Sequence, residues 1–501
     1  MGIAVSPQIH PQVAEFIDQP RKMLINGKWV NAASGKTFPT YNPATGEVLA
    51  QVAEGDREDI NQAVAAARKA FDSGPWRRMT ASERGRLIWK LADLLEQHTE
   101  EFGYIESLDN GKPLNIAKAA DVPLAVDLLR YMAGWATKIE GNTIPLSVPY
   151  TPGAKYHAYT LREPVGVVGQ IIPWNFPLLM AAWKLGPALT TGCTVVLKPA
   201  EQTPLSALRL GELIMEAGFP EGVVNIVPGY GETAGAALAA HPDVDKVAFT
   251  GSTEVGKLIV HAAAGNLKKV SLELGGKSPN VVFKDADLET AIPGSASAIF
   301  FNHGQCCCAG SRLYVEKSIY DQVVEGVAEH ARKIKVGSGL DPDTQMGPLV
   351  SQEQLNRVCG YLEAGFSEGA TAAVGGHRAG DRGYFVEPTV LVNTQESMKV
   401  VQEEIFGPVV TAMPFTDPEE IIPRANNSDY GLAAAVWTRD ISKAHRMAEQ
   451  LRAGTVWINC YNIFDAALPF GGYKQSGWGR EMGHDVLNLY TQTKAVCTRI
   501  A

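Results

Sequence analysis

The sequence predicts an α/β protein with a doubly wound parallel sheet, a second α/β domain and a small β segment. Three observations lead to this fold class. The chain has 501 residues, more than the roughly 100–200 of one domain, so two or three domains are expected. Hydrophobic residues make up 45% and charged residues 20% of the chain, an ordinary globular composition. From Gly166 onward, short apolar runs alternate with amphipathic segments of helical length, which is typical of βαβ units.

The first series of strands follows a region with a helical pattern. Residues 56–138 contain Ala81–Thr99 and Leu124–Lys138, which are long enough to form helices that cover a sheet. Short turns containing Gly, Pro, Ser or Thr then separate five predicted strands. These strands are Gly166–Ile172, Thr194–Leu197, Val223–Val227, Lys246–Phe249 and Lys269–Leu274.

A second series of strands and helices runs from Asn280 to Trp457 and indicates a second α/β domain. Its predicted strands are Asn280–Phe283, Arg312–Val315, Val409–Met413, Ala433–Trp437 and Thr455–Ile458. The last segment, Lys494–Arg499, alternates like a strand that belongs to neither sheet. It is therefore a candidate for pairing with another subunit.

Charge and hydropathy patterns exclude several partners. The formal net charge is −9 and no Lys/Arg-rich block is present, so nucleic acid is not an expected partner. The longest apolar runs, such as Val165–Pro173, are far shorter than the ~20 residues of a membrane-spanning helix, so no membrane association is expected. Met1–Ser6 formally fits the myristoylation pattern, but no second lipid or polybasic signal follows it. A secretory signal pattern is also missing, so a cytoplasmic location is expected.

The seven cysteines stand at positions 193, 306, 307, 308, 359, 460 and 497. Their odd number and irregular spacing in a long chain favour reduced thiols over a disulfide framework. Three consecutive cysteines cannot reproduce the CxxC spacing that brings two thiolates onto one zinc ion. No metal site is predicted.

Polar residues follow several predicted strands, where ligands bind in open α/β sheets. They are Asn175, Lys198, Glu201 and the pair Gly251-Ser252. A carboxylate such as Glu201 can accept hydrogen bonds from ribose hydroxyls and repel the 2′-phosphate of NADP, which favours NAD, although a solvated loop carboxylate is the alternative. Gly251-Ser252 places small residues where helix-start amides can approach a pyrophosphate, but the spacing is not GxGxxG.

Two further positions point to covalent chemistry. Strand alternation turns Ser271 and Glu273 away from the core, and the glycines that follow suit a carboxylate that deprotonates water. An exposed structural carboxylate is the alternative. The glycine-bounded segment Phe301–Gly310 carries three adjacent cysteines and is a candidate for an accessible nucleophilic thiol. Packing cysteines or a thiol protease are the alternatives, although the papain-type signature is missing.

Taken together, seven ordered motifs resemble the aldehyde dehydrogenase superfamily along nearly the whole chain. They are Ile172–Pro177, Lys198–Glu201, Phe249–Gly256, Leu272–Lys277, Gly304–Gly310, Glu404–Pro408 and Pro469–Lys474. The resemblance implies an NAD-binding domain of residues 1–140 and 161–275, and a catalytic domain of residues 276–473. It also implies an oligomerisation segment of residues 141–160 and 474–501. Subunits of this family form dimers or homotetramers built as a dimer of dimers; the homotetramer is the leading expectation, and the final strand is compatible with either.

The resemblance assigns catalytic roles residue by residue. Cys307, the middle cysteine, is the implied nucleophile, and Asn175 with the Cys307 backbone N–H is the implied oxyanion hole. Glu273 is implied to activate the water that hydrolyses the thioester. Lys184 and Glu481 match positions associated with a proton relay behind this base, although a surface ion pair is the alternative. A free thiol has a pKa near ~8.5, so the nucleophile requires activation.

The implied cofactor is NAD, and Lys198 and Glu201 would bind its adenosine ribose. Glu404 would bind the nicotinamide ribose, Phe406 would pack near the nicotinamide, and Ser252 would touch the pyrophosphate. The complete set of implied contacts is Ile171, Pro173, Trp174, Lys198, Glu201, Gly231, Phe249, Gly251, Ser252, Leu274, Glu404 and Phe406.

The positions that match the family's substrate tunnel are mostly aromatic. They are Phe176, Leu179, Trp183, Phe301, Cys306, Cys308, Asn462, Phe464 and Phe470, with Leu124 as a lid. Ring packing favours an aryl or arylalkyl aldehyde. The chain looks most like bacterial phenylacetaldehyde dehydrogenases, in Thr137–Ile139, Pro152–Tyr156, Asp465–Pro469 and Cys497–Arg499, so phenylacetaldehyde is the leading substrate.

Broad oxidation of aliphatic or retinal-type aldehydes is the alternative substrate range, because many members with aromatic tunnels accept aliphatic aldehydes. Relatives that transfer the acyl group to coenzyme A generally lack the carboxylate found here as Glu273. The tunnel positions also supply no Arg pair for a phosphorylated aldehyde. A non-enzymatic scaffold predicts a damaged site, whereas every implied catalytic residue is present.

Overall fold

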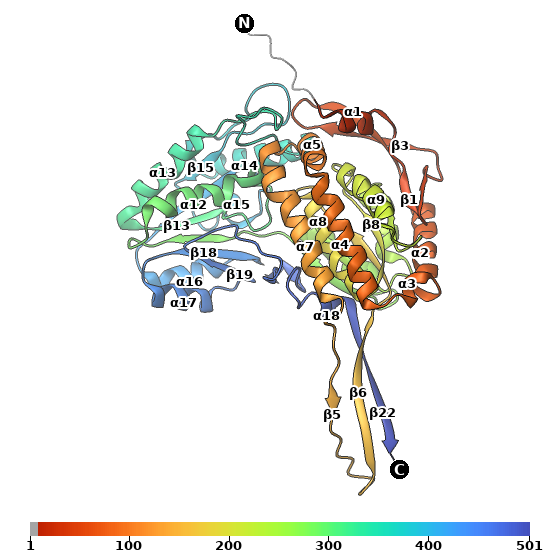
Figure 1. Cartoon of the computed structure of the whole chain (residues 1–501). Coiled ribbons are helices and arrows are strands. Elements are labelled where there is room, and N and C mark those ends of the chain that lie inside the picture. Colours follow the sequence, from red (N-terminus) through yellow and green to blue (C-terminus); the bar gives the residue numbers. More distant parts are fainter. Residues whose placement is uncertain (1–8, 501) are drawn as a thin grey trace.

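The computed structural model describes residues 9–500, which form two lobes and a projecting arm (Figure 1). The first lobe, at the right of the view, contains an eight-stranded sheet. Its central strands, from β9 to β11, are parallel, and β1 and β21 join this core in antiparallel orientation. The predicted parallel sheet is therefore confirmed. The strand order is β2 (Lys28–Val30), β1 (Met23–Ile25), β9 (Val224–Ile226), β8 (Thr194–Lys198), β7 (Val167–Ile171), β10 (Lys246–Thr250), β11 (Lys269–Glu273) and β21 (Gly477–Trp478).

Helices bury both faces of this sheet. On β8, Val195 and Leu197 face one core cluster and Val196 faces another, because alternate side chains point to opposite sides of a strand. The helix α8 is buried along its whole length, since it lies between β8 and the helices α4 and α7. The helices of this lobe are α1 (Pro11–Asp18), α2 (Arg57–Asp72), α3 (Pro75–Arg78), α4 (Ala81–Gln97), α5 (Thr99–Asn110), α6 (Leu114–Ile116), α7 (Val122–Trp135), α8 (Pro177–Thr191), α9 (Leu205–Ala217), α10 (Ala236–Ala240) and α11 (Thr253–Ala263).

Local sequence explains where two long helices begin. Asp56 and Asp59 form a capping box at the start of α2, and Thr80 and Glu83 form another at the start of α4. The predicted helix Ala81–Thr99 ends at Gln97, where α5 follows. The predicted helix Leu124–Lys138 is α7, and a π-helical turn at Ala117–Asp121 precedes it.

The second lobe, at the left of Figure 1, contains a seven-stranded sheet that is parallel except for its edge strand β14. All five strands predicted here are present, and β14 and β15 extend the sheet. The order is β14 (Thr371–Val374), β15 (Thr389–Val392), β16 (Val409–Phe415), β13 (Arg312–Glu316), β12 (Pro279–Val282), β18 (Ala433–Trp437) and β19 (Thr455–Ile458). Its helices are α12 (Leu288–Phe300), α13 (Tyr320–Lys333), α14 (Gln352–Ser367), α15 (Lys399–Gln402), α16 (Pro418–Asn426) and α17 (Ile441–Gln450).

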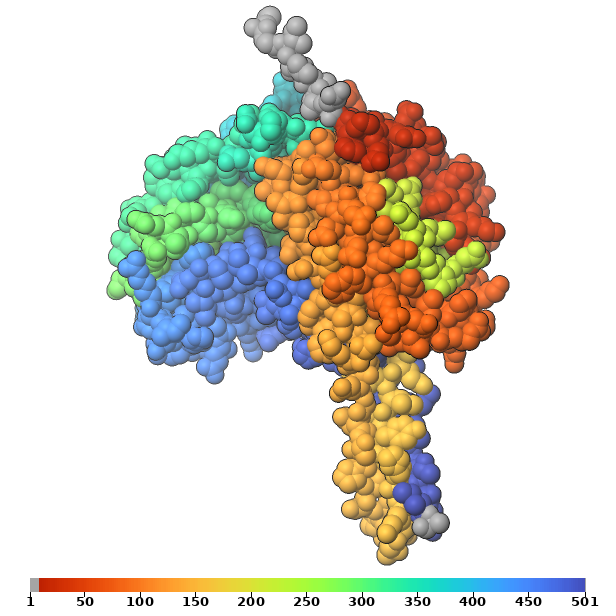
Figure 2. Space-filling model, in the orientation of Figure 1, coloured from red at the N-terminus to blue at the C-terminus, as the bar shows by residue number. Residues whose placement is uncertain are grey.

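A three-stranded antiparallel arm projects clear of both lobes, as Figure 2 shows. It consists of β5 (Thr143–Ile144), β6 (Lys155–Pro164) and β22 (Thr491–Ile500). The predicted detached strand lies within β22 and pairs with β6 of its own chain along its full length. Residues 474–490, which the resemblance placed with the arm, include β21, and β21 instead closes the edge of the first sheet.

Smaller elements complete the lobes. Strands β3 (Thr37–Asn42) and β4 (Glu47–Ala53) form a hairpin, β17 (Tyr430–Gly431) pairs with β20 (Tyr473–Lys474), and α18 (Leu487–Tyr490) precedes the arm. The lipidation pattern at Met1–Ser6 lies outside the described residues. Among residues 9–500, no helix combines the length and the apolar character needed to cross a membrane.

Candidate active site

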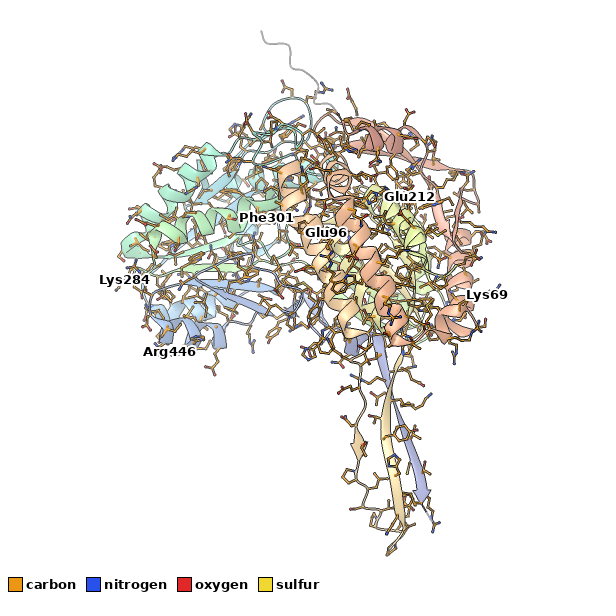
Figure 3. The ribbon with its side chains drawn as sticks, in the orientation of Figure 1. Lys69, Glu96, Glu212, Lys284, Phe301 and Arg446 are labelled. Atoms are coloured by element: carbon orange, nitrogen blue, oxygen red, sulfur yellow. The ribbon has the colours of Figure 1, made fainter. Side chains whose placement is uncertain are left out.

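A cavity of about 610 Å³ lies between the two lobes and is lined by residues from both. The labelled Phe301, at the end of α12, lies where the lobes meet (Figure 3). The first lobe contributes residues that follow β7, β10 and β11, at the carboxyl ends of the parallel strands. The cavity therefore lies where ligands bind in open α/β sheets.

The segment after α12 presents the three adjacent cysteines to this cavity. Two consecutive residues, Asn302 and His303, have φ values of 48° and 60°, and this left-handed backbone turns the chain sharply. Cys306 and Cys308 are buried, with 3.4 Å between their sulfur atoms, whereas Cys307 keeps partial exposure. Cys307 is therefore the thiol most open to a ligand.

The surroundings of the Cys307 thiol disfavour its ionised form. A hydrogen bond shared with the Cys306 thiol, together with burial, raises the pKa of Cys307 well above its ordinary value. Nucleophilic attack requires a group in the same cavity that accepts its proton.

Glu273, the last residue of β11, also lines the cavity. Val270, Leu272 and Leu274 pack in one hydrophobic cluster, as predicted, and Ser271 and Glu273 lie on the other face of the strand. The alternative of an exposed carboxylate is wrong, because the exposures of Ser271 and Glu273 are only 3% and 5%. This face of β11 is covered as well, and Glu273 Oε2 has no hydrogen-bond partner within the described part of the chain. Burial, followed by the negative charge of Glu481, raises the pKa of Glu273 well above its usual range. A carboxyl group with a raised pKa suits a general base that acts near neutral pH.

Lys184 on α8 and Glu481 form an ion pair whose side chains are 1% and 2% exposed. The alternative of a surface ion pair is therefore wrong. The charge of Lys184 opposes that of Glu481 in its effect on the pKa of Glu273. Neither residue lines the cavity, so the pair lies behind the carboxyl group that does.

Asn175 lies between β7 and α8 and lines the cavity next to the cysteine segment. Its side-chain Nδ2 donates to the carbonyl oxygen of Gln305 at 3.1 Å. An amide nitrogen carries two hydrogens, so a second one remains for an oxygen in the cavity. This is the chemistry that an oxyanion hole needs.

Of the residues expected to bind the cofactor, seven line the cavity: Pro173, Trp174, Gly251, Ser252, Leu274, Glu404 and Phe406. Ile171, Lys198, Glu201, Gly231 and Phe249 lie outside its lining. Lys198 Nζ donates a hydrogen bond to Glu201 Oε2 at 3.1 Å. Burial raises the pKa of Glu404 to about 7, and its Oε1 accepts a hydrogen bond from the Gly276 backbone at 2.9 Å.

The residues present fit a dinucleotide. A side chain at Gly251 would collide with the Phe249 ring, so the turn before α11 requires glycine. The start of a helix is where backbone amides bind a phosphate. The Ser252 hydroxyl accepts from the Val255 N–H at 3.2 Å and caps the helix. It thereby holds the helix-start amides in place for an anion, and the carboxylates of Glu201 and Glu404 are groups of the type that accepts hydrogen bonds from ribose hydroxyls.

All nine positions expected in the substrate tunnel line the cavity, as does Leu124. Five aromatic rings on its wall form two groups in contact, one of three rings and one of two. Phe470 lies 5.6 Å from both Trp183 and Phe464, with edge-on geometry in each case, and Phe176 stacks on Phe301 at 6.2 Å. The wall therefore presents aromatic faces and edges to a ligand.

Sequence reasoning missed several residues that line the cavity. Gln354 and Arg357 come from α14, which follows no strand of the predicted sheet and carries no motif signal. Tyr461 follows β19, where the strand-end rule could have identified it. The other missed residues are Ala120, Asp121, Met180, Thr250, Glu254, Gly275, Ser297 and Glu353.

Comparisons with known proteins agree with this arrangement. The model of the Aldehyde dehydrogenase family matches residues 29–496. The mitochondrial aldehyde dehydrogenase of Homo sapiens is 54% identical over 99% of this chain and 94% of its own length. The mitochondrial benzaldehyde dehydrogenase of Antirrhinum majus is 53% identical over 99% of this chain and 92% of its own.

The NAD⁺ complex of an aldehyde dehydrogenase from Bacillus cereus is structurally similar, with a TM-score of 0.97 and 56% identity. The match covers 99% of this chain and 100% of that chain. The family match spans the whole second sheet and every segment that contributes to the cavity. The chain therefore belongs to the aldehyde dehydrogenase family and is an NAD-dependent aldehyde oxidoreductase.

Proposed function

We propose that this enzyme oxidises phenylacetaldehyde to phenylacetate through a thioester on Cys307. The observation that carries the proposal is that Cys307, Asn175 and Glu273 open into one cavity with an aromatic wall. The thiol, amide and carboxyl supply a nucleophile, an oxyanion donor and a base. The rings of Trp183 and Phe470 supply edges that suit a phenyl group.

The first half of the reaction forms the thioester. Cys307 gives up its proton, for which Glu273 is the carboxyl acceptor in the same cavity, and its sulfur attacks the aldehyde carbon. The second hydrogen of Asn175 Nδ2 and the Cys307 N–H stabilise the resulting alkoxide. Collapse to the thioester requires a hydride acceptor, and NAD supplies it when bound beside Glu404.

The second half of the reaction hydrolyses the thioester. Glu273 first passes the proton that it took from Cys307 to the relay behind it, which restores the carboxylate. The carboxylate then removes a proton from water, the hydroxide adds to the thioester carbon, and the Cys307 thiolate leaves with release of the acid. The proton accumulates on Glu273. The Lys184–Glu481 pair behind it stabilises the charge changes of this carboxyl and forms the inner end of a proton relay.

The resemblance supports three further proposals. Residues 1–140 and 161–275 form the NAD-binding domain, with β21 added to its sheet, and residues 276–473 form the catalytic domain. The arm, from residues 141–160 and the end of the chain, joins subunits of a homotetramer. We place this enzyme in the cytoplasm.

The test is phenylacetaldehyde-dependent NADH formation by the wild type and by Cys307→Ala, with and without coenzyme A. We expect activity that needs no coenzyme A and is lost in the variant. Activity with hexanal but not with phenylacetaldehyde would overturn the substrate and favour the broad aliphatic range. Full activity of Cys307→Ala would overturn the thioester mechanism.

A further inference from the structure

Asn302 has an unusual backbone conformation next to the nucleophile segment. Its φ of 48° lies in the left-handed region, and so does the φ of 60° at His303. Neither residue is glycine, so the conformation carries a cost that the surrounding contacts must offset. The side-chain contacts of Asn302 show what holds it there.

The Asn302 amide joins two segments that come from different lobes. Its Nδ2 donates to the Asn175 carbonyl oxygen at 3.0 Å and to the Gln305 carbonyl oxygen at 3.0 Å. Asn175 Nδ2 donates to the same Gln305 oxygen at 3.1 Å. The side chains of Asn302 and Asn175 thus link the first lobe to the residue two positions before Cys307.

The chemistry of these contacts requires a side chain that donates twice. Both partners are carbonyl oxygens, which only accept, so the two hydrogens of an amide nitrogen satisfy both at once. Asn302 is only 7% exposed, so water cannot readily replace it. Asn110 and Lys112 also contact the Asn175 carbonyl, but at 3.4 and 3.5 Å and only from the first lobe.

The oxyanion hole of the proposed function draws its two donors from different lobes. Asn175 Nδ2 belongs to the first lobe, and the Cys307 N–H belongs to the second. A displacement of about 1 Å between catalytic groups can cost about a hundredfold in rate. The reaction therefore needs a device that fixes the two segments relative to each other.

We propose that Asn302 is a positioning residue that clamps the Asn175 segment to the Cys307 segment and so sets the geometry of the oxyanion hole. The inference rests on the catalytic roles of Asn175 and Cys307 in the proposed function. In this role Asn302 does not contact the substrate. Its effect on catalysis passes through Asn175.

The test compares Asn302→Gly, which permits the same φ but removes the amide, with Asn302→Asp, which keeps the shape but removes both donors. The measurement is the rate of the first-turnover NADH burst at saturating NAD and phenylacetaldehyde. We expect the burst rate of both variants to fall by about tenfold to a hundredfold and their affinity for NAD to stay unchanged. Asn393→Gly is the matched control, because Asn393 has a φ of 57° and binds Thr371, remote from the cavity lining.

A double-mutant cycle separates positioning from general damage. In the Asn175→Ala background, Asn302→Gly should cause almost no further loss, since the donor that it positions is already gone. An equal loss in both backgrounds, a wild-type burst in Asn302→Gly, or the failure of both Asn302 variants to fold would overturn the proposal. Loss of the NADH burst on substitution of Cys307 and of Asn175 would support the proposed function, independently of the result for the Asn302 variants.

Discussion

Lys184 and Glu481 form an ion pair in the interior, and the two residues shift the pKa of Glu273 in opposite directions. Lys184 reaches the pair from α8. Glu481 is held by two backbone hydrogen bonds to Phe470, of 2.7 and 2.8 Å, next to the tunnel wall. The relative strength of these two charges therefore adjusts the proton affinity of the proposed general base.

Removing either charge should shift the pH dependence of turnover, and the two shifts should be opposite. The carboxylate of Glu273 is the active form, so the rate rises with pH through its pKa. Lys184→Met removes a charge that lowers this pKa and should move the acidic limb of the pH–rate profile to higher pH. Glu481→Gln removes a charge that raises it and should move the limb to lower pH.

The measurement is kcat against pH under conditions where thioester hydrolysis limits turnover. Glu273→Gln is the control, because it should remove most of the activity and the limb with it. Each variant is assayed below its own unfolding temperature, since breaking a buried pair also lowers stability. Shifts in the same direction for both variants would contradict the electrostatic role.

Glu201→Gln should relax the preference for NAD over NADP. The carboxylate lies 3.1 Å from Lys198 Nζ, where it would face a 2′-phosphate bound at the same ribose. Removing the repulsion should raise the ratio of kcat/KM for NADP to that for NAD by about tenfold, which corresponds to about 1.4 kcal/mol. Glu232→Gln is the matched control, because Glu232 also acts electrostatically on Lys198 but does not bond it. An unchanged ratio in Glu201→Gln would remove Glu201 from cofactor selection.

The sequence was sufficient to predict the central strands of both sheets, and for clear physical reasons. Strands such as Ala433–Trp437 are continuous apolar runs between turns, because helices cover them on both faces. The strands β1, β2, β14 and β15 were missed. They are only three or four residues long, so too few residues alternate for a local pattern to identify them.

The limits of sequence-based prediction at the candidate active site have a similar origin. Alternation along β11 correctly places Ser271 and Glu273 on one face, but it cannot show that this face is covered too. Asn302 carries no motif signal of its own, since its importance lies in contacts with carbonyl groups of two separate segments. The coverage of the β11 face and the contacts of Asn302 both depend on packing between segments far apart in the sequence. A local sequence pattern carries no information on such packing.

Phe470→Leu should impair phenylacetaldehyde more than hexanal. The ring of Phe470 makes edge-on contacts with Trp183 and Phe464, and each such pair contributes about 0.5–1.5 kcal/mol. We expect kcat/KM for phenylacetaldehyde to fall about tenfold and that for hexanal to fall less. Phe283→Leu, which breaks a similar edge-on pair with Phe415 away from the cavity lining, is the control. An equal fall for both aldehydes would contradict recognition of an aryl group by this wall.

Lys112 should be required for stability at neutral pH. It is fully buried, forms an ion pair with Asp121 and lies 3.6 Å from Glu106, so Lys112→Met leaves two buried carboxyls without a cation. Removing one partner of a buried pair costs about 3–5 kcal/mol.

This loss should depend on pH with a defined sign. Burial already raises the pKa of both carboxyls, and Lys112 opposes that rise, so the variant raises these values further. A carboxyl with a raised pKa in the folded state loses stability as pH increases, because the unfolded chain ionises more readily. The deficit relative to wild type should therefore be large at pH 8 and smaller at pH 5.5, as measured by urea unfolding. Adding Glu106→Gln and Asp121→Asn to Lys112→Met should restore much of the lost stability. A stability deficit that is independent of pH would show that Lys112 acts through packing and not through its charge.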